Sequence, residues 1–183
     1  MSLKKAAEAV RKNKSFLITS HVNPEADAIG SQLAFRGLLL KLNKEAFIAD
    51  EDKPPGECLF LPGIDSIHPA AEIKKSYDCA VFLDCADLSR AGRAKSLADK
   101  CGITLNIDHH ISNSRFAGIN WASGQYSCAC EMVYRLYRQM KVPIDKAAAL
   151  QLYAGLVVDT GSFRFNNTNS FCHSMASDLV SKG

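Results

Sequence analysis

Short apolar runs that end at polar turns alternate along this chain with longer segments of helical periodicity. The clearest run is CAVFL (79–83), and SFLITS (15–20), EAFIAD (45–50) and ITLNID (103–108) are similarly short and rich in β-branched or aromatic residues. FAGINWAS (116–123) contains a further short strand. Strands that alternate with helices predict an α/β fold with a mostly parallel sheet and helices on both faces, a Rossmann-like arrangement.

Apolar spacing, capping residues and proline stops define the helices between these strands. Asp145 is a suitable N-cap, and Pro143 ends the helix that precedes it. The predicted helices cover residues 3–12, 28–43, 89–100, 126–141, 144–163 and 170–181. Because no linker divides this series, we expect a single domain over residues 1–183.

Composition and charge exclude several classes of protein. With 183 residues, 47% hydrophobic and 22% charged, the chain is globular, and its net charge of +3 is too small for a polybasic nucleic-acid surface. The sequence has no apolar run as long as a membrane span and no signal peptide, which favours a cytoplasmic protein without a membrane partner. Its seven cysteines form no CxxC pair and are expected to be reduced core thiols.

Acidic and imidazole side chains follow three of the predicted strands directly. The carboxyl ends of parallel strands meet at one edge of a sheet, where ligands bind in open α/β folds, so we expect these groups to converge. A further carboxylate, Asp159, comes at the end of an apolar helical run. The residues that follow the strands are His21, Glu25, Asp27, Asp84, Asp87, Asp108, His109 and His110.

Several carboxylates in one cleft repel one another, and divalent cations relieve that repulsion. Mixed carboxylate and imidazole ligands suit Mn²⁺, with Mg²⁺ or Co²⁺ as competitors, and two ions about 3.5–4 Å apart can share and activate a water. Simpler roles stay open, because Asp27 or Asp87 could cap the next helix and His21 could be a loop histidine. Asp84 and Asp159 follow apolar runs and therefore need a charged partner or a metal.

Four segments resemble, in order and rough spacing, the four motifs of the DHH phosphoesterase superfamily: HVNPEADAIGS (21–31), LDCAD (83–87), NIDHH (106–110) and VVDTGSFRF (157–165). The first and last are most similar to the branch of oligoribonucleases and pAp phosphatases (nanoRNases). The resemblance spans nearly the whole chain. It implies a manganese-dependent enzyme that cleaves very short RNA and removes the 3′-phosphate of 3′-phosphoadenosine 5′-phosphate (pAp).

The resemblance also implies two metal ions that activate a bridging hydroxide for in-line attack on phosphorus. His21 and Glu25 would hold the first ion, and Asp84 would bridge to the second. The other ligands of the second ion would be Asp27, His109 and Asp159.

Four more residues acquire implied roles in substrate binding and catalysis. His110 would face the substrate phosphate, and Asp108 would orient a neighbouring histidine. Arg90 and Arg164 are candidate phosphate contacts, although a surface or structural role is equally open for each of them.

The chain departs from the family pattern in two places. The family usually carries Asp at position 25, and the extra methylene of Glu25 could shift the geometry of the first metal site or weaken it. These enzymes also usually carry a C-terminal domain with a glycine- and histidine-rich substrate-binding motif, which these 183 residues lack. We therefore expect this chain to be the DHH catalytic domain alone.

Other functions remain open at this point. Inorganic pyrophosphatases and cyclic dinucleotide phosphodiesterases use the same catalytic core, and a metal- or nucleotide-binding module without turnover is a further alternative. The family often forms homodimers, and the apolar face of residues 126–140 suits either a dimer contact or core packing.

Overall fold

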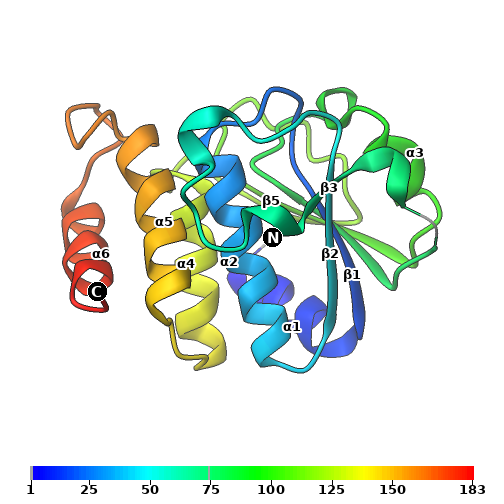
Figure 1. Cartoon of the computed structure of the whole chain (residues 1–183), viewed down its shortest axis with the longest axis horizontal. Helices are drawn as coiled ribbons and strands as arrows, with labels where there is room; N and C mark the ends of the chain where they lie inside the picture. Colours follow the sequence, from blue (N-terminus) through cyan, green and yellow to red (C-terminus); the bar gives the residue numbers. More distant parts are fainter. Residues whose placement is uncertain (1, 74) are drawn as a thin grey trace.

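The computed structural model describes residues 2–73 and 75–183, and its centre is a six-stranded sheet (Figure 1). Neighbouring strands pair parallel throughout, in the order β3-β2-β1-β4-β5-β6. The predicted α/β fold with a parallel sheet is therefore confirmed. The strands are β1 (Ser15–Thr19), β2 (Glu45–Asp50), β3 (Ile67–Pro69), β4 (Cys79–Leu83), β5 (Ile103–Asp108) and β6 (Ile119–Ala122).

Helices cover the two faces of the sheet unequally. Those that pack directly on one face are α1 (Leu3–Lys12), α2 (Ala26–Lys41) and α4 (Ala129–Met140). Outside them lie α5 (Lys146–Asp159), which packs on α2 and α4, and α6 (Ser170–Val180), at the left of Figure 1. On the opposite face, the 3₁₀ turn η4 (Leu88–Ala91) places Ala91 against Ala80 and Phe82.

The order of the strands reverses between β1 and β4. The chain runs outward from β1 to β3 on one side and from β4 to β6 on the other. Thr19 pairs with Phe82, and Leu83 pairs with Ile107, so the carboxyl ends of β1, β4 and β5 lie at one level. In doubly wound sheets, ligands bind in the crevice that opens at such a reversal.

The apolar face of residues 126–140 takes part in core packing. Met132, Val133 and Leu136 of α4 are fully buried in the main cluster, together with Phe16 and Phe35. Of the two roles that the sequence left open for this face, the structure therefore uses it for the core.

The prediction of one helix over residues 89–100 was wrong. The segment divides into η4 and a short α3 (Ala94–Ala98), separated by Gly92 at φ +55°. The side chain of Glu51 lies so close that a Cβ on Gly92 would be 2.7 Å from its Cβ, and the Glu51 carboxylate accepts the N–H of Arg93 at 2.9 Å. This contact with the end of β2 holds the break open.

Other departures are small. The sequence did not indicate β3, nor the 3₁₀ turns η1 (Gly56–Cys58), η2 (Ile64–Ser66) and η3 (Ala70–Glu72). α2 begins two residues earlier than predicted and α4 three residues later, with Cys128 as its N-cap. Asp145 caps α5 as predicted and accepts the N–H of Ala148 at 2.9 Å.

From the sequence we expect no membrane-spanning segment and reduced cysteine thiols. Within the described residues, no helix is long and apolar enough to cross a bilayer. The buried cysteines are thiols that make no disulfide: Cys58, Cys79, Cys85, Cys128, Cys130 and Cys172. Burial raises the pKa of several of them, Cys79 to about 12 for example, which keeps them protonated and unreactive.

Candidate metal centre

Asp84 lies at the centre of the polar residues that gather at the reversal of the sheet. Only 1% of its surface is exposed, and it follows β4 directly with a left-handed backbone at φ +54°, a conformation that Asp tolerates better than most residues. Its backbone N–H donates to Ile107 of β5 at 3.1 Å. The turn therefore fixes a buried carboxylate at the carboxyl edge of the two central strands.

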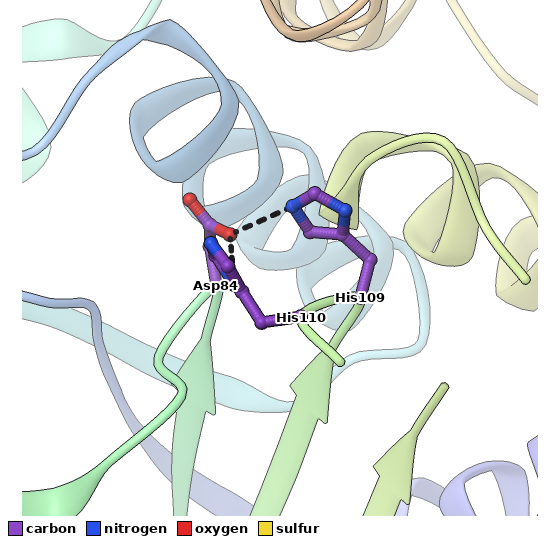
Figure 2. Close-up of side chains that lie close together, drawn as sticks. All are labelled: Asp84, His109 and His110. Carbon is purple, nitrogen blue, oxygen red and sulfur yellow. Dashed lines mark ion pairs between the residues drawn. The ribbon is translucent and has the colours of Figure 1, made fainter. Parts of the chain in front are cut away.

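Three histidines surround the carboxylate of Asp84. Its Oδ2 lies 3.4 Å from Nε2 of His21, and its Oδ1 lies 3.4 Å from Nε2 of His109. Nδ1 of His110 is 3.6 Å from the same Oδ1 (Figure 2). This Oδ1 is buried and accepts no hydrogen bond within the described part of the chain. A buried carboxylate oxygen in this position is suited to a cation.

The first group of potential ligands consists of His21, Glu25 and Asp84. Each offers one ligand atom, and these atoms all lie within 4.8 Å of one another. Nδ1 of His21 lies 2.7 Å from the carbonyl oxygen of Val22, which assigns the proton to Nδ1 and turns the Nε2 lone pair toward Asp84. Glu25 is exposed at the N-cap of α2, and its side chain makes no capping bond there.

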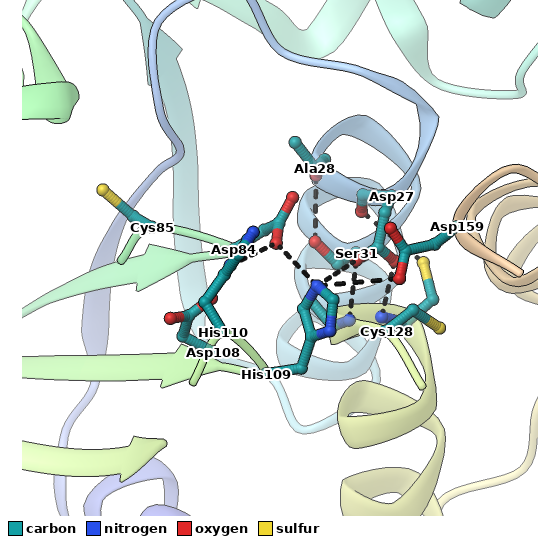
Figure 3. A network of polar contacts seen from close by, with 12 residues as sticks. Asp27, Ala28, Ser31, Asp84, Cys85, Asp108, His109, His110, Cys128 and Asp159 are labelled. Carbon is teal, nitrogen blue, oxygen red and sulfur yellow. Dashed lines mark hydrogen bonds and ion pairs between the residues drawn. The ribbon is translucent and has the colours of Figure 1, made fainter. Parts of the chain in front are cut away.

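The second group consists of Asp27, His109 and Asp159, again with ligand atoms within 4.8 Å of one another. Asp27 is fully buried near the start of α2, and Asp159 is the last residue of α5. The ring of His109 lies among the carboxylates of Asp27, Asp84 and Asp159 (Figure 3). A third such group, of Asp84, His109 and His110, overlaps the other two.

Asp27 does not cap the helix that follows it. Its carboxylate instead accepts the N–H groups of Ala129 at 2.6 Å and Cys130 at 2.9 Å, at the N-terminus of α4. The positive end of a helix favours an anion at this position. By contrast, Asp87 has the simpler role considered for it, because it caps η4 and accepts the N–H of Ser89 at 2.8 Å.

Burial and charge within the cluster shift the pKa values of its carboxyl and imidazole groups. Burial and the nearby charge of Asp84 raise the pKa of Asp27 to about 7, and burial likewise raises the pKa of Asp159 to about 6. Burial alone would lower the pKa of His109, but the nearby Asp84 carboxylate and the charges of the other two carboxylates raise it to about 10. The cluster thus stabilises positive charge at its centre.

The residues of the site fit a metal ion. Carboxylates and imidazoles from separate elements converge, Asp84 presents an oxygen without a hydrogen bond, and two of the carboxyl groups resist ionisation beside each other. Such a ligand set suits Mn²⁺, Mg²⁺ or Co²⁺.

His110 has a separate partner, as the sequence led us to expect. Its Nδ1 lies 2.8 Å from Oδ1 of the fully buried Asp108, and this hydrogen bond raises the pKa of His110. Asn113 donates to Oδ2 of Asp108 and to Oδ1 of Asn106. The imidazole is therefore oriented by a network that begins on β5, and a third of it is exposed.

The two candidate arginines lie outside the cluster of ligands. Arg90 is exposed on η4, where its guanidinium nitrogen Nη2 lies 3.2 Å from Nδ1 of His21. Arg164 is exposed in the turn after α5, where its Nε donates to the carbonyl oxygen of Gly161 at 2.8 Å. Both positions leave guanidinium N–H groups free for other acceptors.

Sequence reasoning missed several residues that support the site. Asn113 holds Asp108, and Asn167 donates to the backbone oxygens of Asp159 and Ser127, both at 3.0 Å. Asp50, at the end of β2, accepts bonds at the base of the turn that carries His21. Amides carry no charge and lie in ordinary polar loops, so no motif marked them.

Comparison with known proteins identifies the family of this chain. The model of the DHH family, N-terminal domain, matches residues 15–156. The chain belongs to the DHH family. Its predicted resemblance is therefore confirmed at the level of the family, and the cluster around Asp84 is the part of this DHH domain where the four quoted motifs meet.

Several relatives of this DHH chain have named activities. Proteins called bifunctional oligoribonuclease and PAP phosphatase NrnA are 33% identical over 91% of this chain in Thermus thermophilus and 29% identical over 91% in Bacillus subtilis. A "Probable manganese-dependent inorganic pyrophosphatase" of Streptococcus mutans is 28% identical over 90% of the chain. These alignments cover 49%, 52% and 54% of the respective relatives, so the chain spans about half of their length.

A solved structure supports the fold of this DHH domain. The exopolyphosphatase-related protein from Bacteroides fragilis is 27% identical, with a TM-score of 0.90 over 99% of this chain and 56% of its own.

Asp50 gives a prediction about stability. Burial raises its pKa to about 6, against partial compensation by hydrogen bonds from Gln32, Ser20 and Thr19. A raised carboxyl pKa means that the folded state holds the proton more tightly, so stability falls as pH rises from about 4 to above 6. Asp50→Asn removes this cost, and we expect it to raise the free energy of unfolding at pH 8 by about 1–3 kcal/mol.

Urea unfolding at pH 4, 6 and 8 measures this effect. The difference between Asp50→Asn and the unmodified chain should shrink toward pH 4, where both side chains are neutral. Asp65→Asn, at an exposed carboxylate, serves as the control and should show no such trend. A variant less stable than the unmodified chain at pH 8 would show that the hydrogen bonds need the charge.

Proposed function

We propose that this chain is the catalytic domain of a metal-dependent phosphoesterase that hydrolyses short oligoribonucleotides, pAp or both. The membership in the DHH family and the named activities of the relatives support this. The observation that carries it is the position of Asp84, whose two oxygens face both groups of potential ligands. We further propose that a second domain strengthens substrate binding, and that the buried thiols indicate a reducing, cytoplasmic setting.

Two Mn²⁺ ions are the proposed cofactors, with Mg²⁺ or Co²⁺ as alternatives. His21, Glu25 and Asp84 would hold one ion, with Asp84 shared between the two. The remaining ligands of the other ion would be Asp27, His109 and Asp159. When bound, such a pair supplies Lewis-acid stabilisation to a phosphoryl group and makes water a stronger nucleophile at neutral pH.

The chain's own residues position the substrate. Asp108 accepts from Nδ1 of His110, so Nε2 of this ring, once it is protonated as well, is the nitrogen that can donate to a phosphate oxygen. Arg90 beside His21, and Arg164 in the turn after Asp159, where it donates to Gly161, are the guanidinium groups proposed to bind phosphate. Asp27 meanwhile keeps its place through the N–H groups of α4, which limits its movement during the reaction.

Glu25 provides a prediction that separates the two ions. Glu25→Gln removes a charged ligand from the first group only, so we expect the affinity for one ion to fall by about 10- to 100-fold while the other is retained. Titration calorimetry with Mn²⁺ measures both events. Glu57→Gln, at another exposed acid in η1, is the matched control. Equal weakening of both ions would contradict the assignment of Glu25 to one of them.

A panel of substrates tests the function itself. With Mn²⁺, the chain should release phosphate from pAp or cleave a diribonucleotide faster than it cleaves pyrophosphate or a cyclic dinucleotide, and the Thermus thermophilus relative serves as a positive control. Pyrophosphatase activity is the second candidate, because a relative carries that name. Hydrolysis of pyrophosphate alone would replace our proposal with this candidate, and binding without turnover would indicate a non-catalytic module.

A further inference from the structure

The turn that follows Asp159 has an unusual backbone. Gly161, Ser162 and Phe163 are three successive residues in the left-handed region, at φ +56°, +58° and +64°. This region is disfavoured for residues with a Cβ, and two of the three carry one. Strained turns of this kind persist only where the surrounding structure holds them, and they cluster at functional sites.

Thr160 holds the turn in this conformation. Its hydroxyl accepts the N–H of Phe163 at 3.1 Å, and its carbonyl oxygen accepts the N–H groups of Arg164 and Phe165, both at 3.0 Å. The ring of Phe163 packs on the ring of His173 in α6, with centroids 5.2 Å apart. Hydrogen bonds within the turn and one aromatic contact with α6 therefore fix its shape.

This shape presents the ring of Phe165 to solvent. The side chain is 58% exposed, although a phenyl ring is costly to leave in water. One side of the ring rests on Gly161, so closely that a Cβ there would lie 2.5 Å from the ring atom Cζ. The contact requires glycine at position 161, and it fixes the ring on the backbone while much of its surface stays open.

Hydrogen bonds from Asn167 link the turn that carries the exposed ring to the candidate metal centre. Asn167 donates to the backbone oxygens of Asp159 and Ser127, which ties the end of the turn to a proposed ligand. In Figure 1 this segment leaves the upper end of α5, the end at which Asp159 lies. Arg164 stands next to the ring in the chain and is also exposed. The turn thus exposes a cation and an aromatic surface within six residues of the proposed ligand Asp159.

We propose that Phe165 determines specificity for nucleotides by stacking on a base of the substrate. A cation for phosphate next to an aromatic ring for the base is the combination that binds single-stranded nucleic acid without sequence preference. The inference rests on the proposed function, because it assumes a nucleotide at the metal centre. It adds that the base is recognised by its π face at this turn, so pyrophosphate, which has no base, would gain nothing from the ring.

The test compares ligands with and without a base. 2-Aminopurine ribonucleoside 5′-monophosphate is titrated into the chain with Mg²⁺, because paramagnetic Mn²⁺ itself quenches fluorescence, and stacking on the ring should quench the base. Inorganic pyrophosphate binding is measured by calorimetry under the same conditions. The variants are Phe165→Leu, which keeps apolar volume without a π face, and Phe165→Tyr, which restores it. Phe60→Leu is the matched control, at a phenyl ring that is 63% exposed on another segment.

Phe165→Leu should weaken binding of the nucleotide by about 5- to 100-fold and abolish the quenching, with no change for pyrophosphate. Phe165→Tyr and Phe60→Leu should behave like the unmodified chain. Equal weakening for both ligands, or none, would overturn the proposal and assign the exposed ring to packing against another polypeptide segment. If the unmodified chain binds pyrophosphate but no nucleotide, the proposed function itself fails, and this inference fails with it.

Discussion

Asp84→Asn is expected to abolish binding of both metal ions and to lower hydrolysis by more than the roughly 10- to 100-fold that is typical of residues that only orient a ligand. Asp84 faces both groups of potential ligands, so loss of its charge affects the two sites together. Asn adopts a left-handed backbone readily, so the turn at φ +54° should persist in the variant. Titration calorimetry with Mn²⁺ is the measurement, with two ions per chain expected for the unmodified protein.

Asp87→Asn is the control for this experiment. It makes the same change three residues further along, where the carboxylate only caps η4. Both ions should remain bound in that variant. Two ions with unchanged affinity in Asp84→Asn would remove Asp84 from the centre of the site. One ion or none in the unmodified chain would show that Glu25 limits assembly, or that assembly needs the half of the longer relatives that this chain does not span.

Gly155→Ala is expected to damage both the fold and the metal centre. A Cβ at this position in α5 would lie 2.4 Å from Sγ of Cys130, 2.8 Å from Oδ1 of Asp27 and 2.9 Å from the Cα of Asp27. The first contact is between fully buried atoms, and the last is with backbone, so neither can yield without moving a helix. We expect a loss of about 1–3 kcal/mol or more in stability and an affinity for Mn²⁺ at least about tenfold weaker, since Asp27 is displaced.

Urea unfolding and Mn²⁺ titration of the same variant measure the two effects. Gly56→Ala is the control, because a Cβ at position 56 would meet no atom within 4 Å. A Gly155→Ala variant with unchanged stability would show that α2 and α5 can separate at little cost. Lower stability with unchanged metal affinity would show instead that Asp27 does not contribute a ligand.

Much of the site was predictable because of where parallel strands end. Asp108 ends a strand that apolar residues identify, and the other site residues follow such strands: His21, Asp84, His109 and His110. Strands in a parallel sheet deliver the residues at their carboxyl ends to one edge. The hydrophobic period of the strands and helices is local information, so the architecture was predictable as well. The order of the motifs then indicated the family before any coordinate was known.

The supporting contacts were not predictable in the same way. Asp27 lies 102 and 103 residues from the N–H groups that it accepts, and Asn167 lies 40 residues from the carbonyl oxygen of Ser127. The predicted helix over 89–100 failed for a related reason, because Glu51, the residue after β2, holds the break at Gly92. Helical propensity depends only on the residues of the segment itself, so it cannot indicate a contact with a distant residue.

The amino-acid sequence alone determined most of the strands and helices, the edge of the sheet where the polar residues meet, and the family. These depend on periodicity and on residues close together in the chain. Only the tertiary structure decided that Asp84 faces both groups of ligands, that Asp27 accepts N–H groups at the start of α4, and that the exposed ring of Phe165 rests on Gly161. The first two depend on distances between separate segments, which the packing of the sheet and of α2, α4 and α5 sets. The third depends on the backbone conformation of the turn after α5, which the residue types did not predict.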